Sequence, residues 1–364
     1  MKISKLSLTN FRNWEERSFD LSEKVLIYGP NARGKTNVLE AIYLSATSRS
    51  FKGKDKEMVK NGQEFARVNT EIAKDGPVEV EVLLKTGERL EKEFKIQGRK
   101  RPAIDFVGEF SAIIFSPDDI NLVSAAPDQK RRYLSYTVGQ KDRQYLYDLL
   151  NYKKILRQRN ELLKKYDLGT IRSEIDVWDV SLAQYGENIT KKRRELADFI
   201  NERITNYYNQ LSGEERVVEF KYLPSIKLGE MLSQLKDGRE KDIRDRNTNQ
   251  GPHRDDWELR LDYLPAEGYA SRGEERTLIL ALKLCERDYF ASRDGILPIV
   301  LLDDVFSELD ESRRRYLIES FKDSQIILTT TDLDHLDESL REGFQLINID
   351  TLQPTLDFQL PINQ

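Results

Sequence analysis

Two reactive side chains, cysteine and histidine, are scarce in this sequence. Among 364 residues there is one cysteine, Cys285, and there are two histidines, His253 and His335. A single cysteine excludes an internal disulfide framework and is typical of a chain that works in a reducing cytosol. Two histidines so far apart in the sequence argue against a histidine-rich metal site.

Long apolar runs and an excess of positive charge are also missing. No run approaches the ~20 apolar residues that a membrane-spanning helix needs, and the first residues, MKISKLSLTNF, lack the apolar core of a signal peptide. We therefore expect no membrane association and a cytoplasmic protein. The net charge of −5 gives no general attraction to nucleic acid, so any such binding must come from local basic patches.

What is present points to a globular α/β chain with more than one part. Its 38% hydrophobic and 33% charged residues suit a protein with a core, and its length exceeds one typical domain. Charged, amphipathic stretches from Lys130 to Tyr166 and from Glu174 to Leu211 predict two arms of a helical hairpin, broken near Asp167 to Gly169. Strand patterns lie on both sides: ISKLSLTNF, KVLIYG, EVEVLLKTGERLEKEFKIQG, AIIFSP, VVEFKYL, WELRLDY, ILPIVLLDD and IILTTTD. We therefore predict an α/β fold with an inserted helical lobe.

A glycine-rich segment matches the phosphate-binding loop G-x-x-x-x-G-K-[ST] at every fixed position. A strand pattern precedes it and a helix pattern, NVLEAIYLSAT, follows, which is the context that this motif requires. Its amide groups and the helix N-terminus would hold the phosphates of ATP, Lys35 would contact the β- and γ-phosphates, and the Thr36 hydroxyl would bind Mg²⁺. An ordinary glycine-rich turn is the weaker alternative. The predicted ATP-binding residues are Gly29, Pro30, Asn31, Ala32, Arg33, Gly34, Lys35, Thr36 and Asn37.

A second carboxylate for Mg²⁺ is expected at the end of a buried strand. Ile299 to Leu302 is an unbroken aliphatic run of the kind found in central parallel strands, and Asp303 and Asp304 follow it. Asp303 would hold Mg²⁺ through water, and Asp304 would orient or deprotonate the attacking water, with Asp304 and Lys35 as the catalytic pair. An acidic loop after a strand is the alternative, but the continuation Ser307-Glu-Leu-Asp310 makes the pattern more specific.

Together these segments resemble the ABC-type ATPase heads of SMC-like proteins and, more closely, the RecF family of bacterial recombination mediators. The resemblance implies a P-loop head made of residues 1–116 and 246–364, a helical insertion at 117–245, and ATP and Mg²⁺ as cofactors. The residues of GPHRDD suggest no role by themselves, and a polar turn is the plain interpretation. The matching segments span nearly the whole chain in the family's order: NFRN (Asn10 to Asn13), GPNARGKTNVLEAIY, FSPDDINLV (Phe115 to Val123), KRRYL (Lys130 to Leu134), GPHRDD (Gly251 to Asp256), YASRGEERTLILALKL and LLDDVFSELD.

Two segments compete for the signature, the Leu-Ser-Gly-Gly-Gln-like turn with which ABC-type heads hold the γ-phosphate of ATP across a dimer. LSGEER begins at Leu211, and SRGEER begins at Ser271. The second opens an apolar helix, so its helix dipole can point at a phosphate, and Ser271 and Glu274 form a capping-box pattern. The first ends a helix at Gly213, and a helix C-terminus has the wrong dipole for ATP. We therefore predict the signature at Ser271, Arg272, Gly273 and Glu274, and a helix-to-strand turn at Leu211 to Glu215.

The resemblance implies a function that depends on dimerisation. Because the signature serves the nucleotide of the opposite protomer, ATP would close a head-to-head homodimer, with Asp310 at the interface, and hydrolysis would open it. Such a dimer would bind double-stranded DNA near single-strand gaps, in the nucleoid, and work with RecR and RecO to load RecA in DNA repair and replication restart. Arg12 could reach the phosphates, as the matching position in SMC-like heads suggests; a surface arginine at a strand end is the alternative.

Three departures from the general ABC pattern predict slow hydrolysis, and the resemblance implies a weak ATPase that DNA stimulates. Asp304 stands where most such heads have Glu, Thr331 falls where a switch histidine follows the strand, and Ser116 or Asp118 occupies the place of a Gln that joins Mg²⁺ to the helical lobe. ATP binding rather than turnover would then carry the function. His335 is nearby, but a solvated surface histidine is the preferred interpretation.

Candidate DNA contacts are confined to short basic runs. A single run of this kind is more often a solvated face, and the resemblance supports several of them lining one face of a dimer. Contacts would be made to phosphates, and so would be salt-sensitive and independent of base sequence. The candidates are Arg49, Lys52, Lys54 and Lys56 after the P-loop helix, Lys130, Arg131 and Arg132, and the runs Gly98 to Arg101 and Lys191 to Arg194.

Three other functions fit the sequence less well. A transporter's ABC subunit is disfavoured by NFRN in place of an early aromatic stacking loop, by the missing switch histidine and by the large helical insertion. An SMC-like structural protein would need longer helical arms. We do not expect a nuclease with an ABC head, because no further catalytic domain is recognisable after Asp332.

Overall fold

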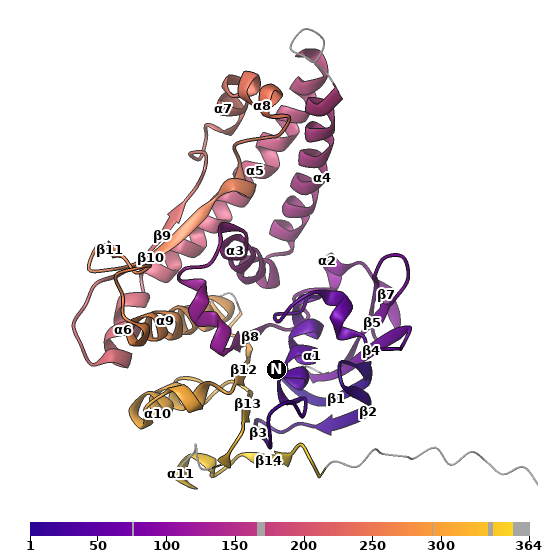
Figure 1. Cartoon of the computed structure of the whole chain (residues 1–364), viewed down its shortest axis with the longest axis vertical. Helices are drawn as coiled ribbons and strands as arrows, with labels where there is room; N and C mark the ends of the chain where they lie inside the picture. Colours follow the sequence, from indigo (N-terminus) through magenta and orange to yellow (C-terminus); the bar gives the residue numbers. More distant parts are fainter. Residues whose placement is uncertain (75, 166–171, 293, 334–337, 352–364) are drawn as a thin grey trace, which may run out of the picture. The chain divides into compact units, whose positions relative to one another are not determined.

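The computed structural model describes residues 1–74, 76–165, 172–292, 294–333 and 338–351. The chain divides into two compact units (Figure 1). One is formed by Met1–Pro117 with Phe290–Gln364, and the other by Asp118–Tyr289. The first unit contains the glycine-rich loop and two sheets, and the second contains the long helices, so the predicted α/β fold with a helical part is confirmed.

An antiparallel sheet covers one side of the first unit. Alternation along the first strand buries Leu6 and Leu8 on one face, as a half-buried sheet requires, and the register shifts between Ile3 and Lys5. The predicted hairpin around Thr86 and Gly87 is present, with Val82 opposite Phe94. The strands are β1 (Lys2–Phe11), β2 (Trp14–Asp20), β4 (Phe65–Ala73), β5 (Pro77–Lys85), β6 (Glu91–Ile96) and β7 (Arg99–Arg101), in the order β2-β1-β4-β5-β6-β7.

A parallel sheet forms the other layer of the first unit. Every residue of β12 and β13 is buried, which explains their unbroken aliphatic sequences. Because parallel strands end at the same edge, the sheet brings the segments after Tyr28, Asp303 and Thr330 together. The strands are β3 (Lys24–Tyr28), β8 (Ala112–Phe115), β12 (Ile299–Asp303), β13 (Ile326–Thr330) and β14 (Gln345–Asn348), in the order β14-β3-β13-β12-β8.

Helix α1 (Lys35–Thr47) lies between these two sheets and contacts strands of both. Eleven of its 13 residues are buried, so the helix forms the centre of the core and shows no solvent-facing stripe. The remaining short helices of this unit are the 3₁₀ turn η1 (Asp55–Met58), α2 (Ala103–Phe106), η4 (Val305–Glu308), α10 (Glu311–Ser320) and α11 (Glu338–Arg341).

The second unit is built on an antiparallel pair of long helices, α4 (Arg143–Lys165) and α5 (Arg172–Asn201), which form the predicted hairpin. Each predicted arm is nevertheless interrupted, the first at Asp142 and the second at Glu202 and Arg203. The predicted break at Asp167 to Gly169 lies outside the described residues. A fully buried Arg159 holds the pair together: Nε donates to Asp179 Oδ1 and Nη1 to Asp242 Oδ2, both at 2.7 Å. Around this pair lie α3 (Pro127–Lys141), α6 (Ile204–Ser212), β9 (Val218–Leu223), α7 (Met231–Asp237), α8 (Arg239–Asp245), η3 (Pro252–Arg254), β10 (Asp256–Leu261), β11 (Leu264–Pro265) and α9 (Arg272–Ala291).

The compact units do not divide the chain where the sequence suggested. The first boundary falls after Pro117, one residue from the predicted position, but the second falls after Tyr289 rather than after Asp245. The cause is that β10 pairs with β9 and packs on α3. The assignment of a functional head to 1–116 and 246–364 stays a prediction, because compactness alone does not define it. Among the described helices, none is both long enough and apolar enough to cross a membrane.

Candidate nucleotide-binding site

The glycine-rich loop connects β3 to α1 in the backbone conformation that its sequence requires. Gly29 and Gly34 have φ of 139° and 98°, values that L side chains rarely adopt. A Cβ on Gly34 would also lie 2.6 Å from the side chain of Asn13. No side chain caps the N-terminus of α1, so its first amide groups are available to an anion. This geometry fits a phosphate-binding loop.

Lys35 is the first residue of α1, and its ammonium group folds back over the loop. Nζ donates to the carbonyl oxygen of Gly29 at 2.6 Å and to that of Pro30 at 2.9 Å. Burial lowers the pKa of Lys35, while Asp304 and Asp303 act in the opposite direction. The loop therefore holds a buried cation at the place where β- and γ-phosphates are expected.

The two residues predicted to bind Mg²⁺ are in direct contact. The Thr36 hydroxyl donates to Asp303 Oδ1 at 2.8 Å, and Thr329 Oγ1 donates to the same oxygen at 2.8 Å. Burial raises the pKa of Asp303, and the two hydroxyl donors oppose that shift. A hydroxyl and a carboxylate oxygen side by side are ligands that Mg²⁺ prefers, so these residues fit the ion.

Asp304 has an unused carboxylate oxygen. The residue adopts a left-handed conformation, with φ of 51°, and its amide donates to the Thr329 carbonyl oxygen at 3.1 Å. Its Oδ1 is buried and has no hydrogen-bond partner among the described residues. Strained backbone and an unsatisfied buried oxygen are both costly in a site without a function. Asp304 thus fits a group that awaits a water molecule or a ligand.

Arg12 is held by a carboxylate that the sequence analysis missed. Its Nε and Nη2 donate to the two oxygens of Glu40 at 2.7 and 2.6 Å, and its Nη1 lies 3.8 Å from Glu57 Oε2. The Glu40 side chain is fully buried in α1 and also accepts from the Ser50 hydroxyl. The structure gives Arg12 a part in bracing α1, and its contact with phosphate stays a prediction. The sequence did contain a signal for this ion pair. Glu40 lies within the apolar run NVLEAIYLSAT, and a buried Glu needs a cation as its partner.

Asn13 is a second residue that the sequence analysis left without a role. Its Nδ2 donates to the Arg33 carbonyl oxygen at 3.2 Å, and its Oδ1 accepts from the Asn37 side chain at 2.8 Å. Asn13 therefore joins the loop to the first turn of α1. The NFRN segment braces the loop from outside through Arg12 and Asn13.

With this geometry described, the family can be tested by comparison with known proteins. A sequence model of the RecF/RecN/SMC N-terminal domain matches residues 2–350. The DNA replication and repair protein RecF of Agathobacter rectalis is 39% identical over 354 residues, which cover 95% of this chain and 96% of that protein. RecF of Clostridium perfringens is 34% identical over 362 residues, covering 96% and 99%. The chain belongs to the RecF family.

Solved structures agree with this membership. A structure of the recombination mediator protein RecF with ATP, in the RecFOR pathway, matches with a TM-score of 0.86 and 31% identity, covering 92% of this chain and 93% of that chain. An Smc head bound to a domain of ScpA matches with a TM-score of 0.51 and 14% identity, which shows the shared head fold alone. The chain therefore has the ABC-type ATPase head fold of the RecF family of DNA replication and repair proteins.

In this RecF family member, the segment at Ser271 forms the predicted capping box. The Ser271 amide donates to Glu274 Oε2 at 2.7 Å, and the Glu274 amide donates to Ser271 Oγ at 3.3 Å. Helix α9 begins at Arg272, and a buried apolar run starts at Leu278. Its N-terminal residues, Ser271 to Gly273, are exposed. The capped helix start is confirmed, and its contact with a partner's ATP stays a proposal.

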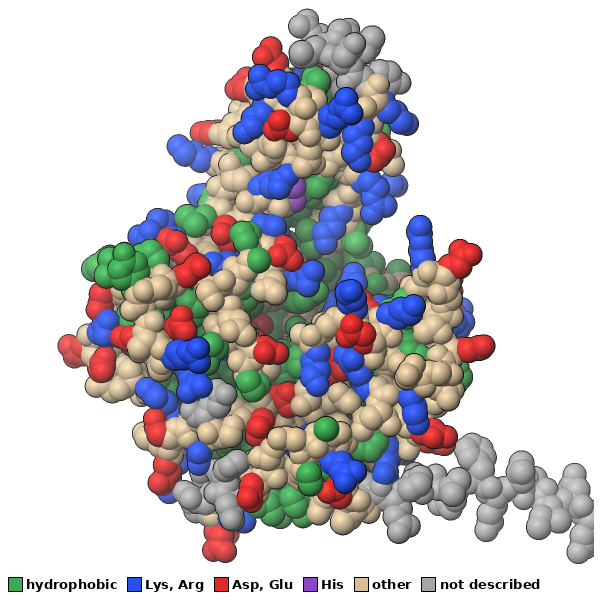
Figure 2. All heavy atoms as spheres, viewed as in Figure 1, with side chains coloured by type: hydrophobic (Ala, Val, Ile, Leu, Met, Phe, Trp, Pro, Cys, Tyr) green, Lys and Arg blue, Asp and Glu red, His purple; other side chains and the backbone are tan. Residues whose placement is uncertain are grey.

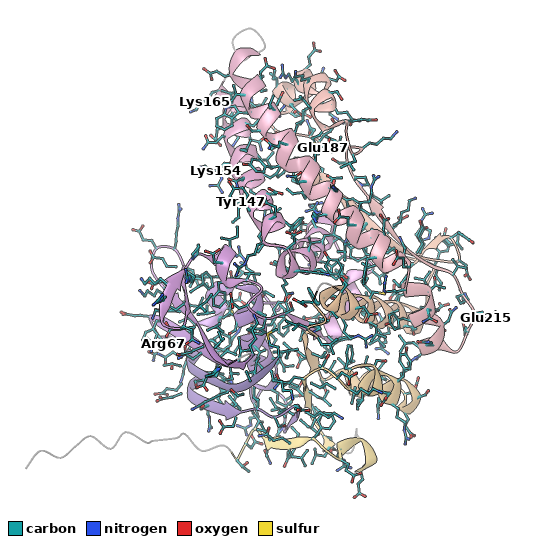
Figure 3. All side chains as sticks on the ribbon, turned by 180° about the vertical axis from the view of Figure 1, so that it is seen from behind. Arg67, Tyr147, Lys154, Lys165, Glu187 and Glu215 are labelled. Atoms are coloured by element: carbon teal, nitrogen blue, oxygen red, sulfur yellow. The ribbon has the colours of Figure 1, made fainter. Side chains whose placement is uncertain are left out.

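The look-alike at Leu211 is the predicted helix-to-strand turn. Helix α6 ends at Ser212, Gly213 adopts a left-handed φ of 74°, and its amide donates back to the Asn209 carbonyl oxygen at 2.9 Å. Strand β9 then begins at Val218. Figure 3 shows Glu215 at the outer edge of this loop. This segment ends a helix, so it presents carbonyl groups where a phosphate site needs amides.

The GPHRDD segment is a buried polar centre rather than a plain polar turn. Asp255 is 1% exposed, and both of its carboxylate oxygens accept hydrogen bonds. Its Oδ2 accepts from Arg193 Nη1 at 2.8 Å and from the Tyr222 hydroxyl. Its Oδ1 accepts from the Ser225 amide at 2.9 Å. Burial lowers the pKa of His253 to about 4, so this ring is neutral at physiological pH. The segment ties α5 to β9 and β10 within the second unit.

The predicted DNA contacts fall into two groups. Lys130 is only 5% exposed, its Nζ lies 5.8 Å from the centre of the Trp257 ring, and it is therefore withdrawn as a surface contact. Arg131 donates to the Asp255 carbonyl oxygen, Arg49 pairs with Asp55 at 3.0 Å, and Lys52 Nζ reaches the Asn37 side chain at 3.5 Å. Arg193, in the predicted run Lys191 to Arg194, is also buried, so it is withdrawn as well. Arg132 lies 3.6 Å from Asp128. The exposed candidates are Arg49, Lys52, Lys54, Lys56, Arg99, Lys100, Arg101, Arg132, Lys191 and Arg194.

The helical hairpin carries cations that the sequence analysis did not single out. Lysine and arginine side chains gather over the α4–α5 hairpin (Figure 2), and Figure 3 shows Lys154 and Lys165 on α4. Both are exposed and have no ion-pair partner among the described residues. In the sequence they belong to an amphipathic helix, where charges on the solvent face are expected in any case.

The remaining predicted residues near the nucleotide site have plain structural contacts. Asp310 caps α10 by accepting from the Arg313 amide at 2.9 Å, and it stays a predicted interface residue. Thr331 follows β13 directly, as the sequence suggested. His335 lies outside the described residues.

Proposed function

We propose that this chain is an ATP-gated DNA clamp, in which ATP closes a head-to-head homodimer on double-stranded DNA near single-strand gaps. The proposal rests on a nucleotide site whose residues are already in position and in which one carboxylate oxygen, that of Asp304, accepts no hydrogen bond from the described residues. Lys35 and the Thr36–Asp303 pair are already in place, and the buried Oδ1 of Asp304 has no partner among the described residues.

The roles of the site residues follow from their contacts. The uncapped N-terminus of α1 and Lys35 would bind the phosphates, and Thr36 with Asp303 would hold Mg²⁺, which neutralises phosphate charge when bound. Asp304 would orient the attacking water and accept its proton. Its side chain is one methylene shorter than the Glu found in most ABC-type heads, so we propose slow, DNA-stimulated hydrolysis that releases the dimer.

The capped start of α9 supports the dimer. The Ser271 hydroxyl accepts from the Glu274 amide, and in the dimer its own hydrogen would be donated to a phosphate oxygen. Ser271, Arg272 and Gly273 are exposed, and a phosphate bound on the opposite protomer would meet the positive end of the helix dipole. Asp310 would lie at the same interface.

The wider function rests on family membership and surface charge. We propose a cytoplasmic, nucleoid-associated protein that works with RecR and RecO to load RecA at gaps. Lys54, Lys56 and Arg132 are among the exposed candidates for phosphate contacts, together with Lys154 and Lys165 on α4. Contacts of this kind release counterions, so retention on DNA should weaken steeply as salt increases.

The Asp304→Asn variant tests this proposal. The amide keeps the size of the side chain but cannot accept a proton, so ATP should still close the dimer while hydrolysis is lost. Light scattering with ATP and Mg²⁺ should show a doubled mass, and the variant should stay on duplex DNA longer than the wild type. Lys35→Ala should show neither effect, because it removes the phosphate contact. If the mass of the wild type is unchanged by ATP, or if retention on DNA is indifferent to salt, the clamp proposal fails.

A further inference from the structure

The look-alike segment contacts the acid of the signature turn. Arg216 is the last residue of LSGEER, and its Nη1 lies 3.2 Å from Glu274 Oε1 and 3.4 Å from Glu214 Oε2. The other oxygen of Glu274 accepts from the Ser271 amide at 2.7 Å. The two oxygens of one carboxylate are therefore divided between the cap of α9 and Arg216.

The direction of the Arg216 side chain is fixed by its neighbours in the second unit. Its Nε donates to Asp262 Oδ2 at 2.5 Å, and its amide donates to Asn209 Oδ1 at 3.0 Å. Asp262 Oδ1 in turn accepts from the Val217 amide at 2.9 Å. Because Asp262 lies in the tight turn after β10 and Asn209 in α6, two elements aim the guanidinium at Glu274.

Glu274 brings a charge that the signature of most ABC-type heads does not have. The Leu-Ser-Gly-Gly-Gln pattern has a neutral Gln at this place, whereas this chain has Glu. Hydrogen bonds with Ser271 lower the pKa of Glu274, and Arg216 lowers it further, so the carboxylate is ionised at neutral pH. An ionised carboxylate in the first turn of α9 offsets the helix dipole and repels an approaching phosphate.

We propose that Arg216 is a positioning residue for the composite ATP site. It neutralises Glu274 and keeps that carboxylate on the Ser271 amide, so that the start of α9 stays attractive to a phosphate. The inference rests on the proposed function of Ser271 in the dimer. The look-alike segment then binds no ATP itself, but it supports the segment that does.

A purely structural role for Arg216 is the rival explanation. The bond to Asp262 joins the start of β9 to the end of β10, so loss of Arg216 could simply loosen the three-stranded sheet. The two explanations differ in what they require of Glu274. Neutralisation needs the charge of Glu274, whereas a sheet support does not.

The first experiment compares Arg216→Ala with a matched control. Arg260→Ala removes an arginine of similar exposure, 26% against 30%, from strand β10, where its ion-pair partner among the described residues is Glu258 of the same strand. Light scattering across protein concentrations, with ATP and Mg²⁺, gives the dimer dissociation constant. Because a dimer contains two such turns, we expect roughly a tenfold increase for Arg216→Ala, a smaller one for Arg216→Lys, and none for Arg260→Ala. The affinity of the isolated protomer for ATP should not change in any of them.

A double-mutant cycle separates neutralisation from sheet support. Glu274→Gln keeps an oxygen for the Ser271 amide but removes the charge, so it should tighten the dimer slightly. In that background, Arg216→Ala should lose most of its effect on the dimer dissociation constant. A loss that persists undiminished in the Glu274→Gln background would assign Arg216 to the sheet and overturn the inference.

The failures of the two proposals are distinguishable. A wild type that shows no ATP-dependent dimer contradicts the proposed function and, with it, the basis of this inference. A wild type that dimerises, together with an Arg216→Ala variant that matches Arg260→Ala, leaves the proposed function intact and overturns only the role of Arg216.

Discussion

LSGEER at Leu211 and SRGEER at Ser271 share nearly the same letters but lie at opposite ends of helices. The first terminates α6 at Gly213, and the second opens α9 with a capping box. A helix start presents unpaired amides and a helix end presents unpaired carbonyls, so only the second can attract a phosphate. We therefore propose that the signature is the second segment, which matches the Leu-Ser-Gly-Gly-Gln pattern less closely, because the direction of the adjacent helix favours it.

The largest difference between the two segments should appear on placing a bulky side chain in each. We predict that Ser271→Arg abolishes the ATP-dependent dimer, because the side chain fills the space that the partner's phosphate would occupy. Ser212→Arg, the matched change in the look-alike, should leave the dimer intact. Light scattering with ATP and Mg²⁺ measures both. Equal loss in the two variants, or no loss in either, would contradict the assignment of the signature.

Replacement by alanine should change the free energy of unfolding in opposite directions at Gly213 and Gly273. Gly213→Ala must adopt a left-handed conformation, with no clash, and should lower the free energy of unfolding by about 1 kcal/mol without changing ATP-dependent dimerisation. Gly273→Ala lies in the first turn of α9 and should raise stability by up to about 1 kcal/mol. It should nevertheless weaken the dimer, because the added methyl group lies where the phosphate approaches. Denaturant unfolding measures the stability of each variant, and light scattering measures its dimer. Changes in the same direction in both variants would contradict the prediction.

Local patterns predicted the local geometry of these segments well. The glycine-rich loop, the buried strand before Asp303, the turn at Gly213 and the capping box at Ser271 all arise from contacts within a few residues. In such segments the spacing of residue types and the direction of the neighbouring element fix the local geometry. The fold class followed from the same patterns.

Contacts between distant residues could not be predicted in the same way. Arg216 and Glu274 are 58 residues apart, Arg193 and Asp255 are 62 apart, and each sequence pattern gave only one half of the pair. Lys130 shows the opposite error, a surface contact predicted for a buried residue. It belongs to a basic run on an amphipathic helix, but its own side chain is buried near the Trp257 ring. Burial of a charge depends on partners that the linear pattern does not display.

The smallest expected effect concerns the pH dependence of the cap. The pKa of Glu274 is lowered below its ordinary 4.5 in the folded chain, so its contribution to stability is present above pH 4.5 and is lost as pH falls through the lower, folded value. We predict that the wild type exceeds Glu274→Gln in stability by a few tenths of a kcal/mol at neutral pH, and that this difference vanishes in acid. Thermal unfolding across this pH range measures it. A difference that grows in acid would contradict the capping role.

The most direct test of the central claim mixes two variants that are inactive alone. Lys35→Ala lacks the phosphate contact and Ser271→Arg lacks the signature, but a mixed dimer contains one site with an intact loop from one chain and an intact Ser271 from the other. Because neither variant dimerises alone, every dimer in a 1:1 mixture is mixed and has one complete site of two, so the mixture should recover ATP hydrolysis up to roughly half the wild-type rate. A mixture as inactive as its two components would show that Ser271 does not serve the ATP of the opposite protomer.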